Sequence, residues 1–391
     1  MTKQIFLIAT IIRLLLIPWF YHPDLKSQYF HFQFLSQGVA NIYQHIAENK
    51  SRLPYTDTFN YLPLTYFTFG SYYALAKLFT PPTLGRWLND WGPNQNLYTD
   101  FPIFLFILKL PYLIFDLLIA YFLFRITSNK LLLKLWLFNP LTLYLVYILG
   151  NFDVLPSLLT LLSLYLLPTN SKFSGLSFGL ATCLKAYSLL FLPVFLVKIF
   201  PNKSKIFSFL LFFSLPLLGT IVPFLPSQDF VKSFLSSGLT QKIIESKINN
   251  IPIFPVIYGF IFFATIKKNV AYSLSLIGLA FLILVKFHTQ WIIWFFPYFL
   301  LSFCRPLPHF LFAATIFLFL CWVALINDHY LTWGHLLPLD PDFLHLTVPH
   351  DFIKFRFLTS PSIVQDQLKF IATVVSLVLV LISWKDEKNN S

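Results

Sequence analysis

The residues that could do chemistry in this sequence are ionisable side chains at the edges of long apolar segments. Asp24 follows the first apolar segment, in the tetrapeptide Tyr21-His22-Pro23-Asp24. A carboxylate in this position can accept the proton of a hydroxyl group as that group attacks an electrophilic carbon. The alternative for Asp24 is structural, because Asp favours turns and helix starts. The sequence therefore indicates a candidate general base at a membrane surface.

Four further ionisable residues lie within or between apolar segments: Lys109, Asp116, Asp153 and Lys185. Burying such groups in a membrane is costly, so they are paired, face a cavity or take part in function. Lys109 and Asp116 are two helical turns apart, which favours a structural network over a direct bridge. Asp153 is a candidate substrate ligand or a helix cap. Lys185 could bind a lipid phosphate as a point charge, or mark the seam between two short helices.

Polar residues also gather where apolar segments begin. Tyr61, in the stretch Asn60-Tyr61-Leu62-Pro63, would lie at the interface, although Pro63 alone also signals a helix start. Lys286, His288 and Gln290 share one short connection. A cation, an imidazole and an amide at this point could hold a phosphate leaving group and stabilise its developing charge. The alternative is a tight polar turn.

Composition places these residues in a membrane. Of the 391 residues, 57% are hydrophobic and 11% are charged, which no soluble domain of this length would show. The formal charge of +12 lies in short loops, which favours positive-inside topology over binding to nucleic acid. The three cysteines fall inside apolar stretches and predict packing, not disulfides or a metal site. We expect the first apolar segment to be a retained span, with Arg13 snorkelling or facing the interior.

Segment length predicts an all-α polytopic membrane protein with about twelve transmembrane helices, in a single domain over residues 1–391. With the N-terminus inside, most cations fall on the cytoplasmic side. Arg125, Lys130 and Lys134 disagree, because this topology places them outside, so either their loop is an exception or a nearby segment is re-entrant. The predicted spans are 5–21, 60–79, 101–126, 132–149, 153–167, 174–200, 206–225, 251–267, 270–286, 290–303, 307–326 and 368–384.

Three non-spanning stretches are then extracytoplasmic: residues 22–59, 226–250 and 327–367. In the first, apolar residues from Phe30 to Ile46 recur every three to four positions. This spacing predicts an amphipathic helix that lies flat on the membrane or packs on the bundle. The third stretch is rich in His and Asp, but the spacings match no compact set of metal ligands.

The order of these landmarks resembles the GT-C superfamily of integral membrane glycosyltransferases, which use a polyprenyl-phosphate-linked sugar. The resemblance covers about the first three quarters of the chain. It is carried by Asp24 after the first span, an aromatic-x-Pro-Leu start at Tyr61, the Lys109 to Asp116 spacing, Asn139-Pro140 with Asp153, Gly179 to Lys185, and Gln290-Trp291 with Trp294 and Pro297. Many relatives carry a second acidic residue beside the first, where this chain has Leu25 and Lys26, so Asp57 is the alternative base.

The resemblance implies an inverting hexosyltransferase in the cell membrane, with its active site on the extracytoplasmic side. Asp24 would be catalytic, and Tyr61, Asp153, Lys185, Lys286, His288 and Gln290 would bind substrate. The transferred sugar would be mannose, with glucose or arabinose as alternatives, and the acceptor a glycan, glycolipid or protein. No cofactor is required, with a divalent metal as the alternative. The rival functions are a polyprenyl-lipid flippase or other transporter, disfavoured by the absence of sequence repeats, and a non-enzymatic scaffold.

Overall fold

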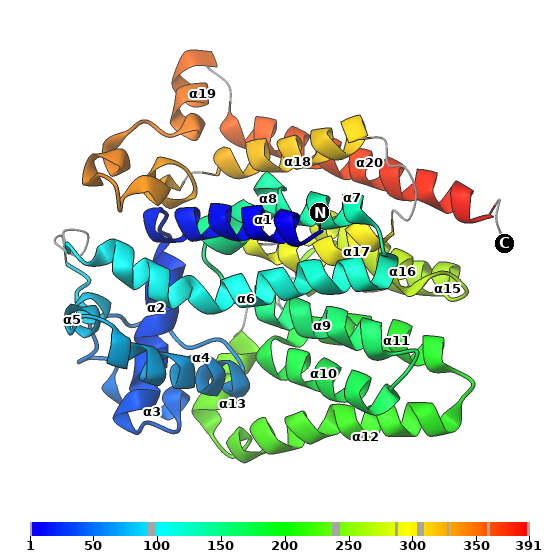
Figure 1. Cartoon of the computed structure of the whole chain (residues 1–391), viewed down its shortest axis with the longest axis horizontal. Helices are drawn as coiled ribbons and strands as arrows, with labels where there is room; N and C mark the ends of the chain where they lie inside the picture. The colour runs from blue at the N-terminus through cyan, green and yellow to red at the C-terminus, as the bar shows by residue number, and fades with distance from the viewer. Residues whose placement is uncertain are drawn as a thin grey trace.

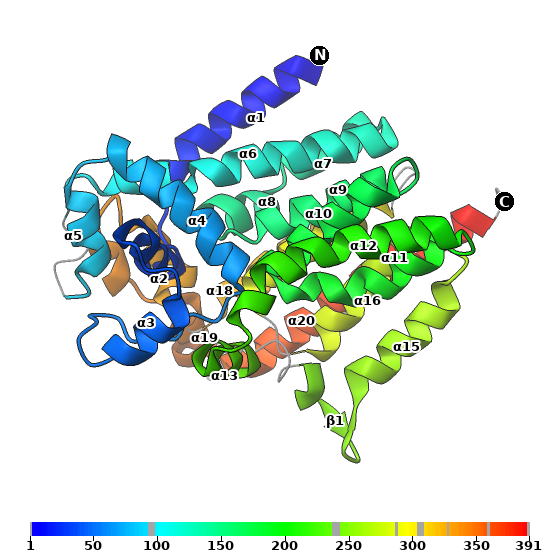
Figure 2. The ribbon, with the colours of Figure 1, turned by 90° about the horizontal axis from the view of Figure 1, so that it is seen from below.

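The computed structural model describes residues 2–92, 98–236, 243–285, 288–302, 309–326, 328–357 and 360–388. Helices dominate this part of the chain. The strands within it are β1 (Lys247–Ile248) and β2 (Ile251–Pro252), which pair antiparallel in a two-stranded turn. The prediction of an all-α protein is thus confirmed. Figure 2 shows α15 (Ile253–Thr265) and β1 standing away from the main body of helices.

The long helices lie side by side along the longest axis of the molecule (Figure 1). They include α1 (Thr2–Leu16), α6 (Phe101–Thr127), α9 (Val154–Leu166), α10 (Ser171–Leu184) and α12 (Lys203–Thr220). This arrangement gives the molecule two ends. We name them the Asp24 end, where α2 (Pro23–Phe32) meets the start of α6, and the Arg125 end, where α6 finishes.

Three helical segments are long and apolar enough to cross a membrane: Thr2–Trp19, Phe101–Thr127 and Lys203–Phe224. A fourth becomes possible if the bent pair Lys130–Leu137 and Pro140–Ile148 forms one span. Five further apolar helical segments in the described part of the chain have 10–17 residues: Val154–Leu166, Ala186–Ile199, Ile253–Thr265, Val270–Leu284 and Ala313–Ala324. The predicted count of about twelve spans is therefore not established by helix length.

The predicted span 60–79 takes a different form. Helix α4 covers only Pro63–Ala76 and packs against α2. The chain then returns through α5 (Thr83–Asn89), whose Trp87 ring lies 6.1 Å from Tyr21 and 5.3 Å from Phe101. Both ends of this hairpin therefore belong to the Asp24 end. Protein covers Tyr66, Phe69 and Trp87 of this hairpin, while Leu75, Leu78 and Phe79 are exposed. Hydropathy alone cannot distinguish burial in protein from burial in lipid.

The predicted span 174–200 is two segments. After α10 the backbone of Lys185 is extended (φ −154°, ψ 121°), and the chain continues as the 3-10 helix η5 (Ala186–Phe191) and α11 (Leu192–Ile199). Phe178 and Phe195 meet at 4.8 Å between ring centroids, so the second segment runs back along the first. Lys185 therefore stands at a seam, which was one of its two predicted roles.

The first of these corrections places Arg125 at the end where most cations lie. Because the α4–α5 hairpin returns to its starting end, α6 runs in the direction opposite to the predicted one. Arg125 then lines the same cavity as Lys198, Lys267 and Lys268. Arg125 thus lies with lysines that were predicted to be cytoplasmic, and Lys130 and Lys134 follow it in α7 (Lys130–Leu137). This agrees with the alternative that a nearby segment does not cross the membrane.

The predicted amphipathic helix of the first loop is also divided. Helix α2 is followed by η2 (Gln33–Gln37), then by Gly38 with φ +86°, and α3 (Ile42–Asn49) begins after an Asn41 cap. A left-handed glycine interrupts the helical repeat. Helix α2 is buried along most of its length, polar Gln28 and His31 included, so it packs inside the protein and does not lie flat on a membrane. Only α3 has one buried apolar side and one polar outer side.

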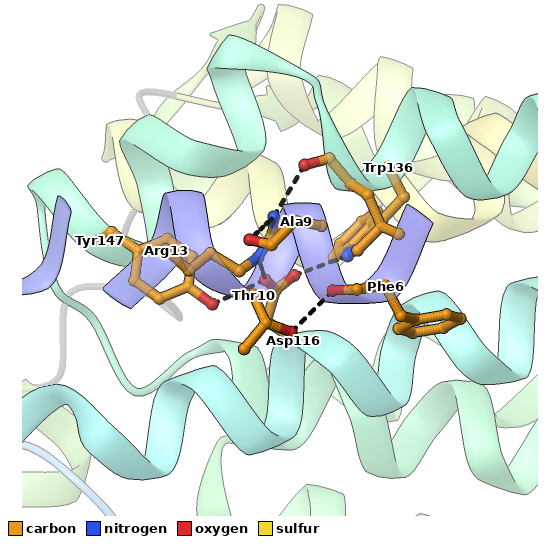
Figure 3. A network of polar contacts seen from close by, with 8 residues as sticks. Phe6, Ala9, Thr10, Arg13, Asp116, Trp136 and Tyr147 are labelled. Carbon is orange, nitrogen blue, oxygen red and sulfur yellow. Dashed lines mark hydrogen bonds and ion pairs between the residues drawn. The ribbon is translucent and has the colours of Figure 1, made fainter. Parts of the chain in front are cut away.

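A buried polar network fixes α1 against α6 (Figure 3). Arg13 pairs with Asp116 and also donates to Leu137 O (2.8 Å), and Asp116 accepts from Trp136 Nε1 (2.6 Å) and the Tyr147 hydroxyl (2.7 Å). Arg13 thus faces the interior. The ion pair with Asp116, and the hydrogen bonds that this carboxylate accepts from Trp136 and Tyr147, offset part of the cost of burying both charges.

Lys109 forms a separate contact and does not touch Asp116. Its ammonium group donates to the backbone carbonyls of Phe20 and Tyr147, which ties the end of the first helix to the π-helical turn η4 (Tyr144–Ile148). The predicted structural role is consistent with this geometry. Gly150 (φ +65°) makes room for the lysine, since an added Cβ would lie 2.8 Å from Lys109 Cε.

The three predicted extracytoplasmic stretches meet at the Asp24 end. In α13 (Gln228–Ser236), the ring centroid of Phe230 lies 4.9 Å from that of Tyr43. His335 of the last stretch contacts the backbone carbonyl of Tyr21 through its Nδ1. The remaining elements are η1 (Ile17–Trp19), η3 (Lys77–Phe79), α8 (Pro140–Leu143), η6 (Val222–Phe224), α16 (Val270–Leu284), η7 (Thr289–Trp294), α17 (Phe296–Leu301), α18 (His309–Ala324), η8 (His329–Leu331), η9 (Trp333–Leu336), η10 (Pro341–His345), α19 (Pro349–Phe357) and α20 (Pro361–Lys388).

Candidate active site

Asp24 occupies the first turn of α2. The cap of this helix is His22, whose Nδ1 accepts from the Asp24 backbone N–H at 3.2 Å. The Asp24 carboxylate lies 3.6 Å from the same nitrogen and keeps 37% of its side chain exposed. Since His22 does the capping, the carboxylate of Asp24 stays accessible from outside.

Asp153 and Lys185 form an ion pair at the same end. Asp153 stands before α9 and Lys185 after α10, and the antiparallel packing of these helices joins them. Lys185 Nζ lies 2.6 Å and 2.8 Å from the two carboxylate oxygens, one of which also accepts from Trp294 Nε1 at 2.8 Å. The carboxylate is 1% exposed and the lysine side chain 15%. Lys185 is therefore paired, with an edge open to solvent.

Tyr61 lies beside this ion pair and near enough to Asp24 for the charge of Asp24 to act on it. Burial first, and then the charges of Asp24 and Asp153, raise the pKa of Tyr61 well above its ordinary value. Its ring is 5.5 Å from Lys185 Nζ and 4.9 Å from the Phe152 ring. The three residues predicted from separate motifs are thus brought together with Asp24 at one place.

The segment that contains Gln290 runs beside the ion pair. Gln290 is buried at the start of η7. Four residues later, the Trp294 ring stacks on the Tyr187 ring, with 4.2 Å between their centroids. Ser157 Oγ in α9 donates to Ile293 O, and this hydrogen bond fixes η7 on α9. His288 precedes this segment as its N-terminal cap position. Lys286, the third residue of the predicted phosphate-binding group, lies outside the described residues.

Asp153 does not act as a side-chain cap. Asn151 Oδ1 accepts from the Asp153 backbone N–H (3.0 Å), and the carboxylate of Asp153 is directed to Lys185 and Trp294. Asn139 does cap a helix, since its Oδ1 accepts from the Leu141 N–H at 2.8 Å. The helix-cap alternative therefore does not fit Asp153.

Sequence reasoning missed two neighbours of Asp24. Gln28 lies one turn along α2 and is buried, with 1% of its surface exposed. Tyr55 donates to Asp57 Oδ2 (2.6 Å), and burial first, followed by this hydrogen bond, raises the pKa of Tyr55. The i, i+4 spacing of Asp24 and Gln28 was the available signal.

His335 anchors the last loop next to Asp24. Its Nδ1 contacts Tyr21 O (3.1 Å) and its Nε2 the Tyr144 hydroxyl (3.1 Å), and burial lowers the pKa of His335 to about 3. The ring is neutral near pH 7 and structural in its contacts. Among the residues that the structure describes, no three His, Cys, Asp or Glu side chains are grouped so that they could hold a metal ion.

Comparison with family models, with curated proteins and with solved structures finds no match for this chain in any of the three. The resemblance to the GT-C superfamily therefore stays a prediction from the sequence.

Proposed function

We propose that the chain is a multi-pass membrane glycosyltransferase of the GT-C type. It would transfer a hexose, mannose first, from a polyprenyl-phosphate-linked donor to an extracytoplasmic glycan, glycolipid or protein. The observation that carries this proposal is the meeting of Asp24, Tyr61, Asp153 and Lys185 at one end of the bundle. The proposed number of spans is about twelve, because one predicted crossing is lost at α4 and one is gained where Lys185 divides a predicted span into two.

In the proposed reaction, Asp24 accepts the proton of the acceptor hydroxyl as its oxygen bonds to the anomeric carbon. The bond from that carbon to the phosphate oxygen breaks on the opposite side, which inverts the anomeric configuration. Lipid phosphate leaves with the electron pair of the broken bond. Half-exposed Asp24 suits this role, because an acceptor can reach it from outside.

We assign the leaving phosphate to the edge of the Lys185 ammonium group, aided by His288 and by Lys286. An ammonium group has three hydrogens, and two of them serve Asp153. The third is available to a phosphate oxygen. Asp153 and Trp294 would then position Lys185 and reduce the net charge that the site presents.

The donor class can be tested with the purified chain in lipid vesicles that contain a glycolipid acceptor. Radiolabelled polyprenyl-phosphate-mannose is compared with the corresponding glucose and arabinose lipids and with nucleotide-linked mannose. We expect label to pass from a lipid-linked sugar to the acceptor and none from the nucleotide sugar. Movement of the intact lipid-linked sugar across the bilayer without transfer would contradict the proposal and favour the transporter function.

A further inference from the structure

The Arg125 end of the molecule contains a cavity of about 780 Å³ where α6, α9 and α11 end and α16 begins. Four cationic residues line it: Arg125, Lys198, Lys267 and Lys268. No Asp or Glu occurs among the described residues that line the cavity. A concave surface with one sign of charge attracts and concentrates ligands of the opposite sign.

These cations come from three connections that are distant in the sequence. Arg125 ends α6, Lys198 ends α11, and Lys267 and Lys268 join α15 to α16. Tyr121, one turn earlier in α6, orients the Arg125 guanidinium, because Nη1 of Arg125 donates to the Tyr121 hydroxyl at 2.7 Å. The fold, and not one basic run, therefore brings the charges together.

An apolar crevice adjoins the basic cavity. It lies between α11, α15 and α16, has an open volume of only about 10 Å³, and is lined by Val194, Val197, Phe262 and Ile266 together with Thr265 and Ser273. It shares Lys198, Lys268 and Val270 with the cavity. A ligand that matches both surfaces carries an anionic head and an apolar chain.

The distance of the cavity from the Asp24 end matches the thickness of a bilayer. Helix α6 has 27 residues and is therefore about 40 Å long, and it separates the cavity from the Asp24 end. This length is close to a bilayer with its headgroup regions. The two sites then face opposite leaflets, a placement that depends on the proposed membrane embedding but not on the proposed reaction.

We propose that the cavity binds the phosphate of an anionic phospholipid of the leaflet opposite to Asp24. Arg125, Lys198, Lys267 and Lys268 hold the phosphate, and the exposed apolar side chains of Phe263 and Ile266 beside the crevice contact the first part of an acyl chain.

The test measures lipid bound to the full chain in neutral detergent by native mass spectrometry. The probes are phosphatidylglycerol, phosphatidylcholine and water-soluble glycerol phosphate. The cavity variant is Arg125→Gln, Lys198→Gln and Lys267→Gln together. A matched control removes three exposed cations at the same end that do not line the cavity, by Lys130→Gln, Lys203→Gln and Lys205→Gln. A third variant keeps the charges, by Arg125→Lys, Lys198→Arg and Lys267→Arg.

We expect phosphatidylglycerol to bind in preference to phosphatidylcholine. The cavity variant should weaken it tenfold or more, since each cation near a membrane surface contributes about fivefold. The control variant and the charge-keeping variant should bind within roughly threefold of the wild type. Equal weakening in the cavity and control variants would overturn the site, because charge anywhere at this end would then suffice. Equal binding of glycerol phosphate and phosphatidylglycerol would overturn the assignment to a lipid.

Discussion

Lys185 shows how a single residue can combine the roles that its sequence context left open. It ends a helix at a seam and is also paired with Asp153 beside Tyr61. The motifs predicted that each of these residues matters. They could not predict the pairing, because it depends on the antiparallel packing of α9 and α10. The partner of Asp116 was missed for the same reason, since Arg13 is 103 positions away.

Breaking the Asp153–Lys185 pair should destabilise the protein more than removing both charges. Asp153→Asn or Lys185→Met alone leaves one largely buried charge without its partner, at a cost of about 3 kcal/mol. The double variant should cost less than the sum by at least about 1 kcal/mol. Thermal unfolding in detergent measures all three. Additive losses would show that the two residues are not coupled in solution.

His31 should make stability depend on pH. Burial lowers its pKa to about 4, against an ordinary value near 6.5, so the unfolded chain binds the proton more strongly than the folded protein. The contribution of His31 is complete above pH 6.5 and is lost as the pH falls toward 4, by about 1.4 kcal/mol per unit. His31→Gln should flatten the unfolding free energy over this range. An unchanged slope would contradict the assignment.

At the scale of elements, the sequence predicted most helices and misjudged two. The segment 60–79 is apolar, yet α4 is covered by α2 and by α10, where Thr65 Oγ1 donates to Leu184 O at 2.7 Å. Hydropathy reports that a segment avoids water and not whether lipid or protein covers it. In the segment 174–200, the extended backbone at Lys185 divides one apolar run into two short helices. No glycine or proline at Lys185 itself signalled this break.

Gly150 should be needed at the junction between η4 and α9. Its φ of +65° and the nearby Lys109 side chain both oppose a Cβ atom. Gly150→Ala should destabilise the protein by about 1–3 kcal/mol, measured by thermal unfolding. The matched control is Gly219→Ala in α12, where a Cβ meets nothing within 4 Å and the change should be neutral or stabilising. Equal effects of the two changes would contradict the constraint at Gly150.

At the scale of the whole molecule, the two misjudged segments have opposite effects on the number of crossings. In the proposed topology, the loss of the crossing at 60–79 reverses α6, and the break at Lys185 restores the original direction for the segments after it. The reversal also explains why Arg125 had looked misplaced, because it lies with Lys198, Lys267 and Lys268. The predicted number of spans can therefore hold although its assignment along the chain changes.

Cysteine labelling tests this arrangement in intact cells. In a background with the native cysteines replaced by alanine, we expect Arg86→Cys on α5 and Asp342→Cys in the last loop to react with an impermeant maleimide. Lys205→Cys at the Arg125 end should react only after permeabilisation. These outcomes follow because α5 returns to the Asp24 end. Labelling of residue 86 with the same sidedness as residue 205 would mean that α4 crosses the membrane.

The proposed role of Asp24 as general base is tested most directly by single-turnover sugar transfer from the lipid-linked donor. Asp24→Asn is compared with Asp57→Asn, the other candidate base, at equal amounts of folded protein. We predict that Asp24→Asn lowers the rate of transfer by about 10²–10⁴-fold, while Asp57→Asn stays within a few-fold of wild type. Transfer by Asp24→Asn at the wild-type rate would contradict the account, and loss of transfer in Asp57→Asn alone would move the base to Asp57.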